Sequence, residues 1–289
     1  MSGWKLGVLG GSGLYELTGL ARADWRRIDS PWGPASDEVL TGELEGVPIV
    51  FLPRHGRGHR LLPGEINMRA NIDVLKRAGC TDLLSISAVG SLREDLPPGA
   101  FALAGQYVDR TRHRPASFFG NGVTAHVSLA DPVCPRLSAL AAAALREGGV
   151  EPFENATYLA MEGPQFSTRA ESRLYRSWGC DVIGMTAMPE ARLAREAELP
   201  YAGVCMVTDY DCWRESEVPV GIEEVLTVMR RNADLARQML RRLLADLPAV
   251  RASSPIDTCL DTALMGDPGG APPQTLAKLQ AILARRLSV

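Results

Sequence analysis

The chain has 289 residues, of which 46% are hydrophobic, and its formal net charge at pH 7 is −3. With a mean hydropathy of −0.03, this composition is typical of a water-soluble protein with ample residues for a core. Basic residues are scattered singly and in pairs, which argues against binding of nucleic acid or anionic lipid. No apolar stretch approaches the roughly 18 residues that a membrane span needs, so no membrane partner is expected.

Neither a signal peptide nor a metal site is expected. Met1–Lys5 leads directly into an apolar run and lacks the pattern of a signal peptide. The six cysteines show no C-x-x-C spacing, which argues against a zinc site. We expect a cytoplasmic protein whose thiols are reduced, structural and mostly buried.

Short apolar runs alternate with helical patterns along most of the chain. The apolar runs predict strands at Leu6–Leu9, Val47–Leu52, Asp82–Val89, Ala100–Ala104, Thr157–Met161, Asp181–Met185 and Tyr201–Val207. The helical patterns, several of them followed by Gly, predict helices at Asn67–Ala78, Pro135–Glu147, Thr168–Trp178, Pro189–Glu198 and Ile222–Asp246. This alternation predicts an α/β fold around a largely parallel sheet.

The last part of the chain has a different composition. We find no internal repeat and no domain boundary before residue 247, so we expect one domain over residues 1–247 and an extension over 248–289. Pro248–Pro273 is rich in Pro, Gly, Ser and Asp, which predicts an irregular connector. Gln274–Leu287 has amphipathic spacing and predicts a final helix, docked on the same domain or on a neighbouring subunit.

A glycine turn follows the first predicted strand, in Gly7-Val8-Leu9-Gly10-Gly11-Ser12-Gly13. Glycines let backbone N–H groups approach an anion, and the Ser12 hydroxyl adds a donor. The segment fits neither nucleotide-binding pattern, because Glu16 stands where a dinucleotide fingerprint has Gly and no Gly-Lys-Ser/Thr follows. An anion site and a plain turn are both open at this point.

A basic segment, Pro53-Arg54-His55-Gly56-Arg57-Gly58-His59-Arg60, follows the second predicted strand. Arginine offers a planar fork for phosphate oxygens, and histidine adds a further donor. The alternative is a solvated basic loop, and the position at a strand end makes the two interpretations about equally good.

Two further strand ends carry small or hydroxyl-bearing residues. Ser85–Arg93 suits a bound oxyanion, but the same pattern is common in plain turns. In Gly184–Glu190, Thr186 is either an N-cap or a ligand, and Met185 is either core or a contact of a ligand.

The segment Met161–Glu171 joins a predicted strand to a predicted helix. Thr168 and Glu171 have the spacing of a capping box, which explains much of it. It does not explain Phe166, an aromatic ring at a junction where it could stack on a base.

Two carboxylates end the last apolar run, in Thr208-Asp209-Tyr210-Asp211-Cys212-Trp213. Ligands of open α/β sheets bind beyond the carboxyl ends of the strands. Two acceptors there suit a ligand with several N–H donors, such as an aminopurine. The alternative is that Asp209 caps a turn and that Asp211 is solvated.

Together these segments resemble the 5'-methylthioadenosine phosphorylases, within the trimeric purine nucleoside phosphorylase superfamily. The resemblance covers about residues 5–245. It implies a single α/β domain with a mixed, twisted and partly barrel-like central sheet flanked by helices. It also implies phosphorolysis of 5'-methylthioadenosine to adenine and 5-methylthioribose 1-phosphate. Phosphate is then a co-substrate, and no cofactor or metal is required.

The resemblance assigns roles to the matching residues. The residues implied to hold phosphate are Ser12, Arg54, His55, Ser87, Ala88 and Thr186. Met185 is implied to lie against the ribose and Phe166 to stack on the purine. Asp209 and Asp211 are implied to contact the base. A carboxylic acid at Asp209 can protonate N7 as the glycosidic bond breaks, which makes Asp209 the catalytic residue.

The base pocket predicts a preference for aminopurines. Relatives that use 6-oxopurines have Asn at the Asp209 position and Glu at the Ser167 position. Adenine reverses both hydrogen-bonding demands, and a buried mismatch costs about 1–3 kcal/mol per unpaired group. Asp209 and Ser167 therefore favour adenine.

The other end of the substrate is expected to meet apolar residues. Val218–Ile222 is apolar, so a thioether methyl would bury there at about 0.8 kcal/mol per methylene-sized group, with Ile222 as the binding and specificity residue. His126 matches a family position that reaches into the neighbour's site. We therefore expect a homo-oligomer, a trimer or a hexamer.

Three other functions are weighed against this one. They are a phosphorylase of inosine or methylthioinosine, a methylthioadenosine nucleosidase, and a purine-binding regulatory protein without turnover. The Arg54-His55 pair argues against a nucleosidase, because water needs no site for a dianion.

Overall fold

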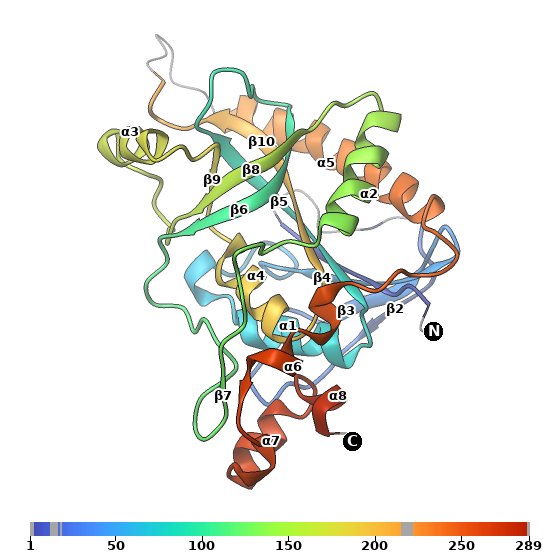
Figure 1. Cartoon of the computed structure of the whole chain (residues 1–289). Helices are drawn as coiled ribbons and strands as arrows, with labels where there is room; N and C mark the ends of the chain where they lie inside the picture. The colour runs from blue at the N-terminus through green and yellow to red at the C-terminus, as the bar shows by residue number, and fades with distance from the viewer. Residues whose placement is uncertain (1–2, 12–16, 18, 215–221, 288–289) are drawn as a thin grey trace.

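Nine strands form one mixed sheet at the centre of the protein (Figure 1). The computed structural model describes residues 3–11, 17, 19–214 and 222–287, apart from the side chains of residues 222–226. The strands of the sheet are β1 (Leu6–Gly10), β2 (Ala21–Arg26), β3 (Val39–Leu44), β4 (Val47–Pro53), β5 (Asp82–Ser91), β6 (Phe101–Asp109), β8 (Phe153–Ala160), β9 (Val182–Gly184) and β10 (Tyr201–Tyr210). Their order is β10-β6-β8-β9-β5-β1-β4-β3-β2.

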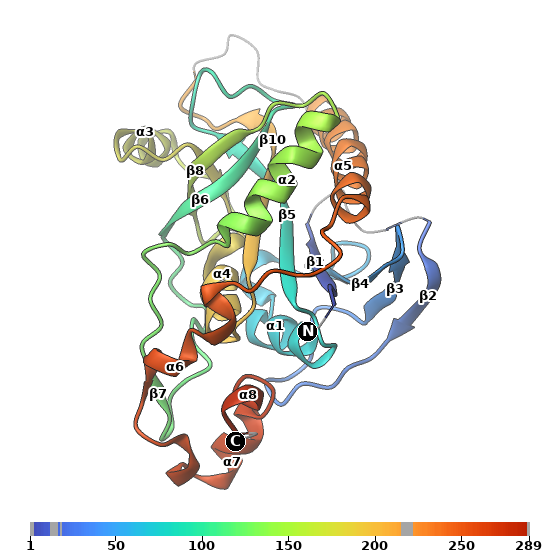
Figure 2. The ribbon, with the colours of Figure 1, turned by 45° about the vertical axis from the view of Figure 1, so that its right-hand side comes forward.

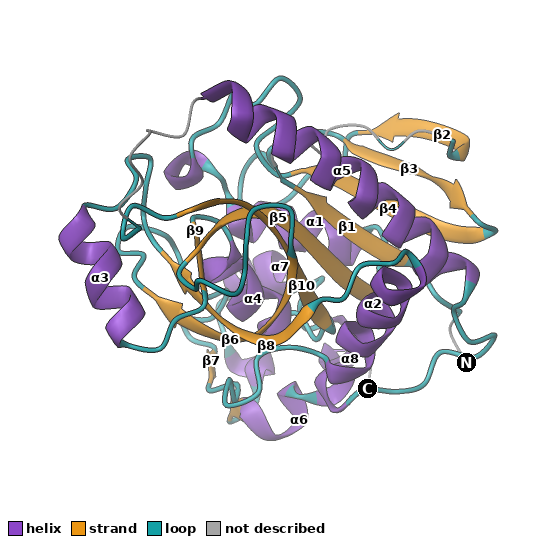
Figure 3. Cartoon of the chain, turned by 90° about the horizontal axis from the view of Figure 1, so that it is seen from above, coloured by secondary structure: helices purple, strands orange, loops and turns teal. Residues whose placement is uncertain are grey.

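Part of this sheet closes on itself. β10 pairs with β6 and also, in parallel, with β5 along nearly its whole length. Strands β5, β10, β6, β8 and β9 therefore form a small barrel, and β1, β4, β3 and β2 extend from it as an open wing (Figure 3). β2 and β3 join antiparallel at the edge, so the sheet is mixed rather than largely parallel.

Helices cover the sheet in two groups (Figures 1 and 2). They are α1 (Met68–Arg77), α2 (Pro135–Glu147), α3 (Arg169–Ser177), α4 (Ala187–Glu196) and α5 (Ile222–Ala245). Apolar residues of α2 and α5, such as Leu137 and Leu240, pack in one cluster with Phe51 of β4. Residues of α1 and α4, such as Leu75 and Leu193, belong to a second cluster. The amphipathic patterns of the helices thus bury their apolar sides against the sheet from two directions.

The predicted strands and the first five predicted helices are all present, with ends shifted by a few residues. The predicted capping box is confirmed, because Thr168 accepts from the Glu171 amide and Glu171 reaches back to Thr168. β2 and β3 were not predicted. β2 is exposed along almost its whole length and carries charged residues, so it lacks the apolar pattern that reveals a strand.

The prediction of one final helix over Gln274–Leu287 is wrong. The structure has two short helices, α7 (Pro273–Leu279) and α8 (Ala284–Leu287), joined by a turn. The intervening residues include neither Gly nor Pro, so no helix-breaking residue marks the turn. Leu279, Ile282 and Leu283 all belong to the core cluster of α1 and α4.

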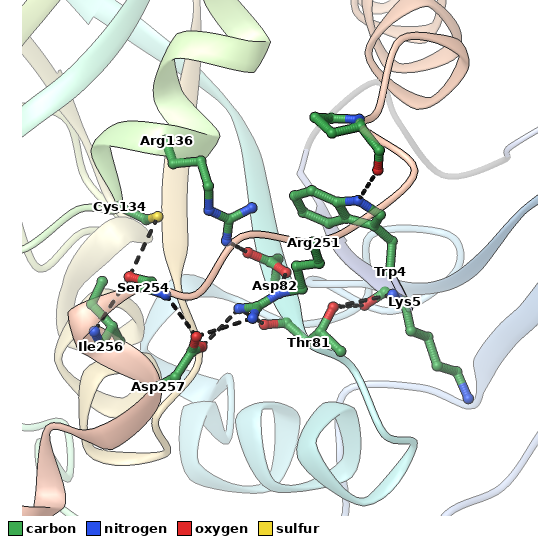
Figure 4. Close-up of polar contacts among 11 residues, drawn as sticks. Trp4, Lys5, Thr81, Asp82, Cys134, Arg136, Arg251, Ser254, Ile256 and Asp257 are labelled. Atoms are coloured by element: carbon green, nitrogen blue, oxygen red, sulfur yellow. Dashed lines mark hydrogen bonds and ion pairs between the residues drawn. The ribbon is translucent and has the colours of Figure 1, made fainter. Parts of the chain in front are cut away.

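The connector is also more ordered than its composition predicts. It contains the 3₁₀ helices η2 (Pro255–Thr258) and η3 (Pro268–Gly270), the short helix α6 (Leu260–Ala263) and β11 (Leu264–Met265), which pairs with β7 (Thr124–Ala125). Arg251 forms ion pairs with Asp82 of β5 and with Asp257, and Arg136 of α2 also pairs with Asp82 (Figure 4). The extension is thus attached to the body of its own chain.

One short 3₁₀ helix, η1 (Pro63–Glu65), precedes α1. Within the described residues, no helix is long and apolar enough to cross a membrane.

Candidate active site

A cavity of about 350 Å³ lies at the carboxyl ends of β1, β4, β5, β9 and β10. Its volume falls in the usual range of small-molecule sites, roughly 300–1,000 Å³. Its position is the one that ligands occupy in open α/β sheets. The residues predicted from the sequence that line it are Arg54, His55, Ser87, Ala88, Phe166, Met185, Thr186, Asp209 and Asp211.

The sheet itself makes room for this cavity. Along one edge β5 pairs with β1 through Asp82–Ile86 and then with β9 through Gly90–Ser91. Ser87, Ala88 and Val89 lie between these two registers, and all three line the cavity. The divergence of β1 and β9 therefore exposes a short piece of a central strand to a ligand.

Arg54 lies at the floor of this cavity and is fully buried. Its Nε donates to Glu190 at 2.7 Å, and its Nη2 donates to Glu190 and to Ser85. Further bonds run from Nη2 to the carbonyl of Leu9 and from Nη1 to the carbonyl of Ile86, each at 3.2 Å. The alternative of a solvated loop is thus wrong for Arg54, whose guanidinium is held inside the protein.

His55 is buried beside Arg54 and has a fixed orientation. Its Nδ1 lies 2.9 Å from the carbonyl oxygen of Leu61, and its ring stacks on His59 with centroids 4.3 Å apart. Burial lowers the pKa of His55 to about 4, and the nearby charge of Arg54 acts in the same direction. The imidazole is therefore neutral at pH 7.

Ser87 and Thr186 complete this polar end of the cavity. Both are buried, at 6% and 7% exposure. Thr186 stands at the N-cap position of α4, yet its hydroxyl makes no capping hydrogen bond. The helix-start interpretation therefore does not account for the Thr186 side chain.

The two carboxylates lie together at the opposite end. β10 has a bulge between Val207 and Asp209, a feature that often re-aims side chains next to active sites. Thr208 Oγ1 lies 2.6 Å from Asp209 Oδ1 and 3.2 Å from the carbonyl oxygen of Val89. Burial raises the pKa of Asp209, and the adjacent Asp211 raises it further.

Asp211 is buried, and one of its carboxylate oxygens accepts no hydrogen bond from the described residues. Its Oδ2 is enclosed and has no hydrogen-bond partner among the residues that the structure describes. The Ser172 hydroxyl is near enough to oppose the rise in the pKa of Asp211 that burial causes, but lies outside hydrogen-bonding geometry. This oxygen is therefore an acceptor that a donor from a ligand can use. The interpretation of Asp211 as a solvated turn residue is wrong.

Phe166 and Met185 lie at the cavity, whereas Ser167 does not. Phe166 lies at the cavity with 83% of its surface exposed, and Met185 lines the wall. Ser167 is not part of the lining. Its hydroxyl lies 3.6 Å from the sulfur of Met161, and its carbonyl accepts from the thiol of Cys212.

The remaining predicted site residues are either outside the described residues or elsewhere on the chain. Ser12, Val218–Gly221 and the side chain of Ile222 lie outside the described residues. His126 lies elsewhere on the chain, where its amide donates to the carbonyl of Ala263 and its side chain lines a second cavity with Arg195 and Asp261. The predicted role of His126 in a neighbour's site stays a prediction.

Comparisons with known proteins agree with this geometry. The sequence matches the family model of the phosphorylase superfamily over residues 5–245. It is 55% identical to the S-methyl-5'-thioadenosine phosphorylase of Cereibacter sphaeroides, over 98% of both chains. The chain belongs to the methylthioadenosine phosphorylase family.

Solved structures of this family have the same fold. A methylthioadenosine phosphorylase from an Antarctic soil metagenomic library matches with a TM-score of 0.92 and 42% identity, over 97% of this chain and 99% of that one. A methylthioadenosine phosphorylase from Schistosoma mansoni, solved in complex with adenine, matches with a TM-score of 0.80 and 35% identity, over 84% and 91%.

Two residues that shape this phosphorylase site, Glu190 and Arg114, were not predicted from the sequence. Glu190 is in a quoted segment, but nothing local shows that it meets Arg54. Arg114 donates to the carbonyls of Glu162, Met185 and Met188, and so ties together the two loops that carry Phe166 and Thr186. Both contacts join positions far apart in the chain, so no sequence pattern could have found them.

The cysteine side chains are mostly buried, as expected. All six cysteines are free thiols, and only Cys212 and Cys259 are partly exposed. Among the described residues, no group of three His, Cys, Asp or Glu side chains is arranged to hold a metal ion.

Proposed function

We propose that this chain catalyses the phosphorolysis of 5'-methylthioadenosine to adenine and 5-methylthioribose 1-phosphate. One observation carries the proposal: a single cavity is lined by the acceptors Asp209 and Asp211, which lie beside Gly90 of β5, and also by Arg54, His55, Ser87 and Thr186. The cavity thus offers a place for an amine-bearing base and a place for phosphate, on two sides of one small ligand.

The base end favours an aminopurine. Asp209 and the unpaired Oδ2 of Asp211 accept hydrogen bonds, which suits the exocyclic amine of adenine. A 6-oxopurine would bring the carbonyl O6 to the same carboxyl groups, where the single proton on Asp209 is needed at N7. The inosine alternative is therefore not favoured, in agreement with the relatives, which are methylthioadenosine phosphorylases.

The geometry around Asp209 fits a proton donor. When Asp209 is ionised, the single hydrogen of the Thr208 hydroxyl serves only one of its two close acceptors. A proton on Asp209 turns both contacts into hydrogen bonds, and burial raises its pKa in the same direction.

The reaction needs only groups that this cavity offers. A phosphate oxygen forms a bond to C1' of the ribose while the bond from C1' to N9 breaks and its electron pair moves into the purine. Asp209 gives its proton to N7, so adenine leaves neutral. Arg54 donates to the phosphate, and His55, whose neutral ring has its lone pair at Nε2, accepts from the P–OH group rather than adding a donor. No cofactor or metal takes part, and phosphate is the co-substrate.

The test is release of adenine with and without phosphate. Adenine should appear from 5'-methylthioadenosine only when phosphate is present, together with an equal amount of a sugar 1-phosphate detected by phosphorus NMR. Equal release without phosphate would identify a nucleosidase. Tight binding without turnover would identify a purine-binding protein.

The assembly and location are part of the same proposal. The protein is a cytoplasmic homo-oligomer, a trimer or a pair of trimers, in which His126 reaches a neighbour's cavity and the apolar segment up to Ile222 meets the methylthio group. The position of His126 outside its own chain's cavity supports this arrangement. Light scattering after size exclusion measures the oligomer, and a fully active monomer would contradict the role of His126.

A further inference from the structure

A buried carboxylate, Glu190 of α4, lies behind the phosphate end of the cavity. The exposed fraction is 1% for the Glu190 side chain and 0% for Arg54. The Glu190 carboxylate accepts hydrogen bonds from Arg54 Nε at 2.7 Å, Arg54 Nη2 at 3.2 Å, Ser85 Oγ at 2.7 Å and Tyr201 Oη at 2.9 Å. Glu190 is not among the residues that line the cavity.

These bonds occupy most of the N–H donors of the Arg54 guanidinium. Nε and Nη2 are occupied by Glu190, Ser85 and the carbonyl of Leu9. Nη1 has two hydrogens and makes one hydrogen bond, to the carbonyl of Ile86, within the part of the chain that the structure describes. One Nη1–H is therefore left for a ligand.

Nη1 lies next to a residue of the cavity lining. Gly11, which lines the cavity, lies so close that a Cβ at this position would be 2.9 Å from Nη1. Nη1 is thus the guanidinium nitrogen next to the predicted phosphate position.

We propose that Glu190 is a positioning residue for phosphate, which orients Arg54 so that its remaining Nη1–H points to the phosphate oxygens. The inference rests on the phosphate site proposed above. Its physical basis is that a guanidinium recognises oxyanions through N–H bonds in a fixed plane, so its orientation matters as well as its charge.

Charge alone predicts the opposite effect of Glu190. A carboxylate next to Arg54 neutralises its positive charge and so weakens its attraction for a dianion. Glu190 can favour phosphate binding only by holding the guanidinium in place. The sign of the effect of its removal therefore distinguishes the two possibilities.

The main test is Glu190→Gln, with steady-state kinetics for both substrates. Gln has nearly the same volume, removes the charge and leaves one acceptor oxygen for the four donors. We expect the KM for phosphate to rise about tenfold or more, the equivalent of one charge-assisted hydrogen bond, while the KM for 5'-methylthioadenosine stays within about twofold. A lower or unchanged KM for phosphate would overturn the proposal.

Two milder variants cover the case in which Glu190→Gln does not fold. Glu190→Asp keeps the charge but withdraws the carboxylate by one methylene. Ser85→Ala removes one donor to Glu190 and one acceptor of Arg54 without a change of charge. Both should raise the KM for phosphate, by about threefold or more for a weakened neutral hydrogen bond. An unchanged value in both would overturn the proposal.

Glu196→Gln is the matched control. Glu196 is a buried carboxylate of the same helix, but it accepts from Ser117 and from the Phe118 amide, away from Arg54. Its loss should leave the KM for phosphate unchanged. An increase equal to that of Glu190→Gln would show a general effect on α4 and overturn the proposal.

Arg54→Met separates this inference from the phosphate site on which it rests. An unchanged KM for phosphate in Arg54→Met would disprove the phosphate role of Arg54 and the inference with it. An increase in Arg54→Met without one in Glu190→Asp or Ser85→Ala would disprove the role of Glu190 alone.

Discussion

Nδ1 of His55 lies 2.9 Å from the carbonyl oxygen of Leu61. A carbonyl can only accept, so Nδ1 carries a hydrogen and the neutral ring has its lone pair on Nε2. His55 therefore enters the reaction as a neutral side chain with a fixed tautomer, which has a consequence for stability.

The ligand-free protein should lose stability as the pH falls below 6.5. Burial lowers the pKa of His55 to about 4, against 6.5 for an unperturbed histidine. Between pH 6.5 and pH 4 the imidazole is therefore protonated in the unfolded chain but not in the folded protein. The stability due to neutral His55 is fully present above pH 6.5 and decreases toward pH 4. At pH 5 the loss is about 2 kcal/mol.

Urea unfolding of wild type and His55→Gln at pH 7.5 and pH 5 measures this effect. The decrease between the two pH values should be about 2 kcal/mol smaller in the variant. His113→Gln, which changes an exposed histidine, should behave like the wild type. Equal decreases in wild type and His55→Gln would contradict the assignment.

Asp209→Asn should strongly impair turnover of 5'-methylthioadenosine. Asn cannot give a proton to N7. Its amide N–H groups would also face the exocyclic amine of adenine, which is itself a donor, so kcat/KM should fall at least about 100-fold. Burial disfavours the ionised form of Asp209, so this substitution should not lower the melting temperature.

The same variant tests the base preference. Its amide can donate to O6, so the ratio of kcat/KM for inosine to that for adenosine should rise. If the ratio stays the same, Asp209 does not set the choice of base.

Phe166→Ala should weaken nucleoside binding without loss of stability. The ring is 83% exposed in the ligand-free chain, so its removal leaves no internal cavity. Loss of stacking on the base costs about 1–3 kcal/mol, so the KM for 5'-methylthioadenosine should rise about tenfold while the KM for phosphate is unchanged. Leu174→Ala, which removes another exposed apolar side chain nearby on α3, is the control and should change neither KM.

Gly11→Ala should impair phosphate binding for a steric reason. A Cβ there would lie 2.9 Å from Arg54 Nη1 and 2.9 Å from the backbone oxygen of Ile86, which cannot move away easily. We expect the KM for phosphate to rise at least about tenfold, the cost of one displaced charge-assisted bond. Gly270→Ala, where a Cβ meets nothing within 4 Å, should keep wild-type kinetics. Wild-type kinetics in Gly11→Ala as well would contradict the placement of Arg54.

The core strands and most helices could be predicted because their signals are local. Runs such as Tyr201–Val207 are apolar because both faces of the strand are buried, and a glycine marks the end of several helices. β2 escaped prediction because one exposed edge strand needs no apolar pattern. The break between α7 and α8 escaped because residues 280–283 contain no Gly or Pro to mark it.

The sequence by itself determined the α/β fold and the residue types at the strand ends, and its motifs indicated the family. These follow from side-chain chemistry and from spacing along the chain. The roles of Ser12, Ile222 and His126 stay predictions.

Only the tertiary structure decided how these side chains are used. It buried Arg54 against Glu190, 136 positions away, fixed the tautomer of His55 and left Asp211 Oδ2 without a donor. The physical reason is that burial and hydrogen bonding depend on neighbours in space. The residues that supply those neighbours come from strands and helices that the sequence separates and the fold brings together.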